Sequence, residues 1–198
     1  MVEWKDSLFR AFSDWKTLLL GLIISIVPVL NFATYGFGLN CARKPYDRKL
    51  PSFRQFGGLW VQGLLSVIIM VLYSLPALIV FGIGYLTDQY DTLILIIAGI
   101  FAVVAYYFLP MAWMKFAYGK FGGAFRLGAI AGKCFSLKYF GAWLLLSILT
   151  FIIAVLLNFI AILLSFTIVG PFIIMGFLAF WLAVFGFTIY GQLYEELR

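Results

Sequence analysis

The sequence predicts an all-α, polytopic integral membrane protein. Of its 198 residues, 65% are hydrophobic and only 11% are charged. A water-soluble domain of this length still exposes much of its surface, so its interior is too small for so many apolar side chains. Five apolar runs cover residues 17–42, 59–86, 92–114, 139–164 and 166–190, and each exceeds the ~20 residues that a spanning helix requires. We therefore expect a single multi-pass domain, residues 1–198, in the cell membrane.

Residues 1–16 precede the first run and have the pattern of an interfacial amphipathic helix. Trp4, Leu8, Phe12 and Trp15 fall on one face of such a helix. A helix of this kind lies in the plane of the headgroups, with its aromatic rings at the boundary. Three acidic residues balance the three basic ones, and no small-residue cleavage site follows. We therefore expect this segment to belong to the mature protein and not to be a signal peptide.

The first run, residues 17–42, contains Pro28 and Asn31 near its middle. As one helix it would be ~39 Å long, against a hydrocarbon thickness of ~30 Å, whereas the part before Pro28 reaches only ~18 Å. Proline removes a helix hydrogen bond, and the freed groups need partners away from lipid. Asn31 and Thr34 are placed to supply some of them. We expect a re-entrant hairpin with Pro28 and Asn31 at its turn; the alternative is a kinked fifth span.

The other four runs predict four full transmembrane helices, paired as hairpins over residues 59–114 and 139–194. Basic residues gather in the connections 43–58 and 115–138, with five Lys or Arg in each, whereas the connection between the second and third runs holds only Asp88 and Asp91. Since cytoplasmic connections accumulate Lys and Arg, both basic connections and the C-terminus are expected inside. A re-entrant first run would also place the N-terminus inside, so that all 14 basic residues share one face.

These basic connections predict contact with anionic lipid headgroups. Each Lys or Arg near an anionic surface contributes about 1 kcal/mol of attraction. Topological sorting alone is the alternative explanation. Nucleic acid is not an expected partner, because the charges are dispersed along the membrane boundary without a recognition fold. The residues expected to contact headgroups are Arg43, Lys44, Arg48, Lys49, Arg54, Lys120, Arg126 and Lys133.

A Phe-Arg pair precedes each predicted hairpin. The pairs are Phe9-Arg10, Phe53-Arg54 and Phe125-Arg126. The pattern indicates three units, each an interfacial helix followed by an apolar hairpin, which is a form of internal repeat that membrane proteins use. Coincidence in a chain with 22 phenylalanines is the alternative.

Small residues recur at helical spacing along every spanning run. They allow close helix packing where lipid offers no hydrophobic drive for association. On the fourth run several of these positions carry polar side chains. These side chains either pack against a neighbouring helix or line a narrow pore. The residues of this stripe are Ser147, Thr150, Asn158 and Ser165.

Chemistry-bearing residues are scarce in this chain. No Asp, Glu, Lys, Arg or His lies in the apolar interior of any run, which counts against ion-coupled transport. The chain has no histidine to activate a serine or cysteine, and Cys41 and Cys134 alone do not make a metal site. We expect no catalytic, cofactor-binding or metal-binding residues, and no enzymatic activity.

Several short motifs, spread over nearly the whole chain, resemble a known family. They are Val27-Pro28-Val29-Leu30-Asn31-Phe32, Leu50-Pro51, Tyr73-Ser74-Leu75-Pro76 and Gly191-Gln192-Leu193-Tyr194. In these residues the chain resembles the prokaryotic, largely archaeal, membrane proteins grouped as domain-of-unknown-function family four-thousand-and-thirteen. The resemblance implies a small polytopic α-helical protein, distantly similar in layout to the Yip-type membrane-shaping proteins. It implies no activity and no functional residue.

The leading functional hypothesis is a non-enzymatic membrane protein that organises or shapes the bilayer, as a homo-oligomer. The interfacial helices, the re-entrant hairpin and the basic cytoplasmic face motivate it, since insertion into one leaflet expands that leaflet relative to the other. One alternative is a channel or facilitator for a small solute or ion, with the Ser/Thr/Asn stripe lining its pore. Another is an accessory subunit of a membrane complex.

Overall fold

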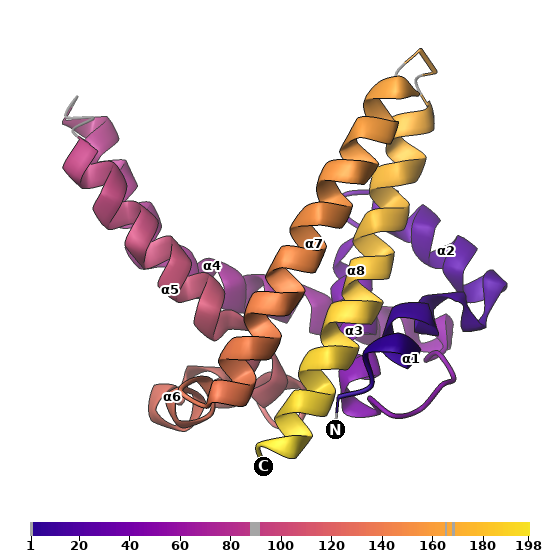
Figure 1. The fold of residues 1–198 in the computed structure, drawn as a ribbon, viewed down its shortest axis with the longest axis horizontal. Coiled ribbons are helices and arrows are strands. Elements are labelled where there is room, and N and C mark those ends of the chain that lie inside the picture. The colour runs from indigo at the N-terminus through magenta and orange to yellow at the C-terminus, as the bar shows by residue number, and fades with distance from the viewer. Residues whose placement is uncertain (1, 88–91, 165, 168) are drawn as a thin grey trace.

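The long helices form two hairpins. The computed structural model describes residues 2–87, 92–164, 166–167 and 169–198, and all regular structure within them is helical. Four helices are long and apolar enough to cross a membrane: α4 (Phe56–Leu86), α5 (Thr92–Ala117), α7 (Leu137–Leu163) and α8 (Val169–Glu196). The α4–α5 and α7–α8 hairpins diverge from a common base (Figure 1). The predicted all-α class and the four spanning helices are confirmed.

The first apolar run forms two short helices. Helices α2 (Trp15–Ile26) and α3 (Phe32–Arg43) have 12 residues each, about 18 Å, which is less than a bilayer core requires. The chain leaves α2 at Val27, which is extended, and Pro28 follows in the turn. The turn of this short hairpin lies lower than the tips of the two long hairpins (Figure 1). The sequence thus located the break at Pro28.

Helix α8 forms the centre of the fold. In its most apolar stretch 56% of the residues are buried, against 11% in α4, 17% in α5 and 11% in α7. Helices α2, α3 and α7 pack around α8, and α3 also packs along α4. At Gly36 and Gly63 an added Cβ would overlap the backbone of Leu59 and Phe32, respectively. Glycine therefore permits the close approach of α3 and α4.

Short helices precede the first hairpin and connect the three hairpins. They are α1 (Trp4–Phe9), η1 (Arg10–Ser13), η2 (Phe53–Gln55), η3 (Phe121–Phe125) and α6 (Leu127–Cys134). Both termini and α6 lie at one end of the molecule in Figure 1. All the Lys and Arg residues lie within residues 2–16, 43–55, 115–138 and 195–198. We call these four segments the charged end.

The N-terminal segment differs from the continuous helix expected over residues 1–16. It consists of α1, then η1, and an extended residue at Asp14. The Asp14 carboxylate accepts hydrogen bonds from the Lys16 backbone N–H (3.0 Å) and from the Thr17 hydroxyl (2.6 Å). These bonds begin α2 in a new direction, because Asp is a favourable N-cap residue. The amphipathic pattern alone did not show this break.

Candidate functional site

A cationic pocket of about 270 Å³ lies at the charged end. Lys115 reaches it from the last turn of α5, and Lys120 and Arg126 reach it from either side of η3. Tyr118 and Tyr194 contribute aromatic walls, and Gly119 and Gly123 complete the lining. None of the residues that line the pocket is acidic. Three cations around one hollow form a positively charged surface, and surfaces of this kind attract anionic headgroups.

Lys133 extends this cationic cluster. Its ammonium group donates a hydrogen bond to the Leu197 carbonyl oxygen (2.6 Å) and lies 4.4 Å from the centre of the Tyr194 ring. The Lys115 ammonium lies 5.9 Å from the same ring. Burial lowers the pKa of Lys133, and the neighbouring charges of Lys115 and Arg198 lower it further. A bound anion would relieve that repulsion, since an opposite charge favours the protonated amine.

Glu195 binds Tyr118, which lines this pocket. Its Oε1 accepts a hydrogen bond from the Tyr118 hydroxyl (2.9 Å), which is also 2.6 Å from the Ala42 carbonyl oxygen. Burial raises the pKa of Tyr118, and the bond to Glu195 raises it further. Tyr118 therefore stays a neutral donor and joins α3 to α8 beside the pocket.

The structure brings together only part of the predicted headgroup set. Lys120 and Arg126 line the cationic pocket together with Lys115, which was not among the predicted residues. Lys133 lies against the Tyr194 ring that lines the pocket. Arg43 instead donates hydrogen bonds to the Ala117 carbonyl oxygen (2.6 Å) and to Asn40 Oδ1 (3.2 Å). It thus holds the end of α3 against the end of α5. The remaining predicted residues, Lys44, Arg48, Lys49 and Arg54, are exposed over the connection between α3 and α4.

Arg10 is a buried arginine whose hydrogen bonds were not predicted from the sequence. It is 5% exposed. Its guanidinium donates hydrogen bonds to the carbonyl oxygens of Cys41 (3.1 Å) and Lys44 (2.8 Å), and to Thr188 Oγ1 (3.0 Å). The end of a helix presents free carbonyl groups and partial negative charge, which a buried cation can satisfy. The Phe-Arg pattern gave no signal of this, because Arg54 and Arg126 are exposed in the corresponding pairs.

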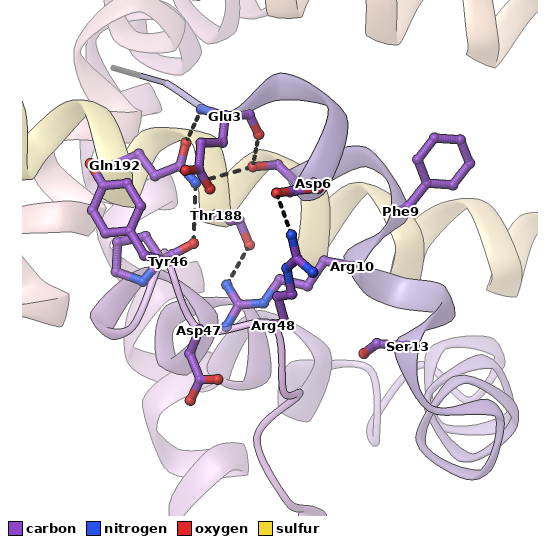
Figure 2. Close-up of a pocket in the computed structure, with 12 residues that line it drawn as sticks. Glu3, Asp6, Phe9, Arg10, Ser13, Tyr46, Asp47, Arg48, Thr188 and Gln192 are labelled. Carbon is purple, nitrogen blue, oxygen red and sulfur yellow. Dashed lines mark hydrogen bonds and ion pairs between the residues drawn. The ribbon is translucent and has the colours of Figure 1, made fainter.

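A second pocket, of about 180 Å³, opens beside Arg10 (Figure 2). Asp6 and Arg48 form an ion pair of 3.3 Å across it. Gln192 of α8 accepts a hydrogen bond from the Glu3 backbone N–H (2.8 Å) and donates one to the Ser7 hydroxyl (3.3 Å). The polar groups that bind one another here join the N-terminal segment to α8.

The turn of the short hairpin is stabilised differently from the prediction. The side chain of Asn31 forms no capping hydrogen bond, so the expectation that it satisfies the turn backbone is wrong. The indole N–H of Trp60, on α4, instead donates to the Val29 carbonyl oxygen (2.7 Å). The hydroxyls of Ser25 and Thr34 lie 2.8 Å apart and link α2 to α3. Pro28 is exposed at the turn.

The polar residues of the α7 stripe lie in different environments: Ser147 and Thr150 lie near other helices, whereas Asn158 is exposed. Thr150 lines a cavity that Asn31 also lines, and the Ser147 hydroxyl lies 3.3 Å from the Tyr106 hydroxyl. Asn158 is exposed and donates a hydrogen bond to the Ala154 carbonyl oxygen of its own helix (2.8 Å). Ser165 lies outside the described residues, as do Asp88 and Asp91.

The thiols lie away from this cavity and from solvent. Cys41 and Cys134 are both buried and free, and burial raises the pKa of Cys134 to about 12. Within the described part of the chain, no group of three or more His, Cys, Asp or Glu side chains is placed to hold a metal ion.

Four long apolar helices with one charged end define a polytopic α-helical membrane protein. A family model described as "Protein of unknown function (DUF4013)" matches residues 19–162, and the chain belongs to this family. The family resemblance in the sequence is thereby confirmed. Neither a curated protein nor a solved structure matches the chain.

Proposed function

We propose that this protein is a non-enzymatic membrane protein that shapes the bilayer by occupying more of one leaflet than of the other. One observation carries the proposal: the α2–α3 hairpin is too short to span and lies on the same side as the charged end. Helices α1 and α6 add to that half, whereas only the two long hairpins extend to the opposite end (Figure 1). Protein volume is therefore concentrated in one half of the molecule.

Such an asymmetric shape acts on the bilayer through lipid area. A re-entrant hairpin and interfacial helices displace lipids in the leaflet where they insert, and that leaflet expands relative to the other. The positive-inside tendency assigns the charged end to the cytoplasmic side. The bilayer should therefore curve with the expanded cytoplasmic leaflet on its convex side. Several copies acting as a homo-oligomer would enlarge this curvature.

The cationic pocket supports the proposal by favouring anionic lipid at the inserted face. Lys115, Lys120 and Arg126 together contribute about 3 kcal/mol at roughly 1 kcal/mol each, which corresponds to about 100-fold in affinity. Anionic headgroups would hold the short helices at the membrane surface. A pore along α7 stays a prediction, because Asn158 is exposed and bonded to its own helix.

Reconstitution into liposomes tests this function. At high protein density, electron cryomicroscopy of vesicles containing phosphatidylglycerol should show smaller or tubular vesicles. Vesicles of phosphatidylcholine alone should respond less. The variant Lys115→Gln, Lys120→Gln, Arg126→Gln should bind phosphatidylglycerol about 100-fold more weakly and should lose most of the difference between the two lipids.

A matched variant separates the pocket from net charge. Lys5→Gln, Lys16→Gln, Lys138→Gln removes the same number of charges from exposed positions elsewhere at the charged end. It should keep more of the difference between the two lipids than the pocket variant does, because these three charges do not surround the pocket. Vesicles of unchanged size and shape at high protein density would overturn the bilayer-shaping function.

A further inference from the structure

A cavity of about 330 Å³ lies midway along the long helices. Side chains of α3, α5, α7 and α8 line it. Its position is set by Asn31 at the start of α3 and by Tyr106 and Thr150 near the middle of α5 and α7. The other residues that line it are Thr34, Tyr35, Leu109, Pro110, Trp113, Leu146, Ala179, Leu182, Ala183, Gly186, Phe187 and Tyr190.

Four polar side chains that line this cavity have no hydrogen-bond partner among the described residues. Tyr190 is only 9% exposed, and its hydroxyl forms no hydrogen bond with any described residue. The same holds for the hydroxyls of Tyr35 and Thr150 and for the side-chain amide of Asn31. Of the four, Tyr190 is buried and Asn31, Tyr35 and Thr150 are half-buried. Buried polar groups are nearly always hydrogen-bonded, and hydrocarbon chains offer none of the four a partner. A polar guest in the cavity would satisfy them.

The lining also defines the chemistry of that guest. No Asp, Glu, Lys or Arg lines the cavity, so a charged guest would meet no opposite charge. Hydroxyl and amide groups both donate and accept hydrogen bonds, which matches a guest with several hydroxyls. Trp113 and Phe187 add flat apolar walls. The volume lies within the range of about 300–1,000 Å³ that is typical of small-molecule sites.

We propose that this cavity binds an uncharged glycerol-type polyol. Two sources share that chemistry: free glycerol, and the uncharged glycerol headgroup of a diacylglycerol. The hydroxyls of Tyr35 and Tyr190 hold the polyol, and Asn31 and Thr150 complete the polar surface. This binding is independent of the bilayer-shaping function, since it uses none of the charged residues.

Two binding assays on the purified protein in lipid nanodiscs distinguish the sources. The first photo-crosslinks a diazirine-labelled dioleoylglycerol and maps the modified peptides by mass spectrometry. The second measures radiolabelled glycerol by equilibrium dialysis. We expect saturable binding of at least one probe, with crosslinks on α3, α5, α7 or α8 when dioleoylglycerol is the guest.

The variant Tyr35→Phe, Tyr190→Phe removes two hydroxyls and keeps both rings. It should weaken binding about tenfold or more and leave the unfolding temperature unchanged or raised. Asn158→Leu, exposed on α7 and outside the cavity, should bind as the unmodified protein does. Saturable dioleoylglycerol or glycerol binding that the double variant loses supports the proposal. Absence of binding by either probe, which leaves water as the only guest, or equal binding by the double variant, overturns it.

Discussion

The short and long hairpins solve the same problem of backbone polarity in different ways. In α3, eight of 12 residues are buried, whereas in α4 only five of 31 are. A spanning helix pairs its backbone groups internally and can face lipid along its length, but a helix that ends within the membrane exposes unpaired groups there. Helix α3 of the short hairpin is therefore enclosed by protein, whereas only four of the 12 residues of α2 are buried. The stability of the short hairpin therefore depends on its contacts with α4 and α8. Substitutions at these contacts should change the free energy of unfolding more than substitutions in the long hairpins.

The largest expected effect comes from the contact between α3 and α4. Gly36→Ala places a Cβ on the backbone carbonyl of Leu59, which cannot move as a side chain can. We expect a loss of about 3 kcal/mol in the free energy of unfolding, at the upper end for an overpacked core. Unfolding titrations with SDS in mixed micelles measure it.

Gly99 on α5 provides the matched position in a long hairpin. A Cβ there meets no atom within 4 Å. Gly99→Ala should therefore be neutral, or stabilising by up to about 1 kcal/mol through helix propensity. Equal losses at Gly36 and Gly99 would contradict the difference between the hairpins.

The next effect concerns Arg10, which joins the N-terminal segment to the end of α3 and to α8. Arg10→Gln removes charged hydrogen bonds to Cys41, Lys44 and Thr188, and should destabilise the protein by about 2 kcal/mol. Arg54→Gln changes the exposed arginine of the second Phe-Arg pair and should stay within about 0.5 kcal/mol. The same titrations compare them. Similar values would mean that the three Phe-Arg units are equivalent.

The smallest effect concerns the turn of the short hairpin. Trp60→Phe removes the indole donor and leaves the Val29 carbonyl unpaired, so we expect a loss of about 1 kcal/mol. Trp15→Phe is the control, because Trp15 is 65% exposed at the start of α2. If both variants unfold alike, Trp60 does not stabilise the turn.

Local features of the sequence predicted the framework of the fold. Apolar length predicted the four spanning helices, and Pro28 predicted the break between α2 and α3, because both effects depend on neighbouring residues. The partners of buried polar groups were not predictable in this way. Trp60 reaches Val29 and Arg10 reaches Thr188 only after distant segments pack.

For the candidate sites, too, the sequence predicted local features but not the contacts that form only when distant segments pack. Charge counting located the basic connections and included Lys120, Arg126 and Lys133. It did not separate them from Arg43, which binds the Ala117 carbonyl oxygen, because both groups look alike in sequence. Asn31 stood out as a polar residue in an apolar run, but the structure was needed to bring it to the cavity of Tyr190.

The most direct test of one-sided insertion is the labelling of single cysteines by a membrane-impermeant maleimide in sealed vesicles of known orientation. Lys5→Cys, Arg54→Cys and Thr87→Cys introduce exposed thiols in α1, at the charged end and at the far tip of α4. The native thiols are buried, and with a pKa raised to about 12 the Cys134 thiol stays protonated at pH 8. Labelling of positions 5 and 54 from one side and of position 87 from the other is the predicted result. Labelling of position 5 from the same side as position 87 would show that the first apolar run crosses the membrane, and would contradict the short hairpin.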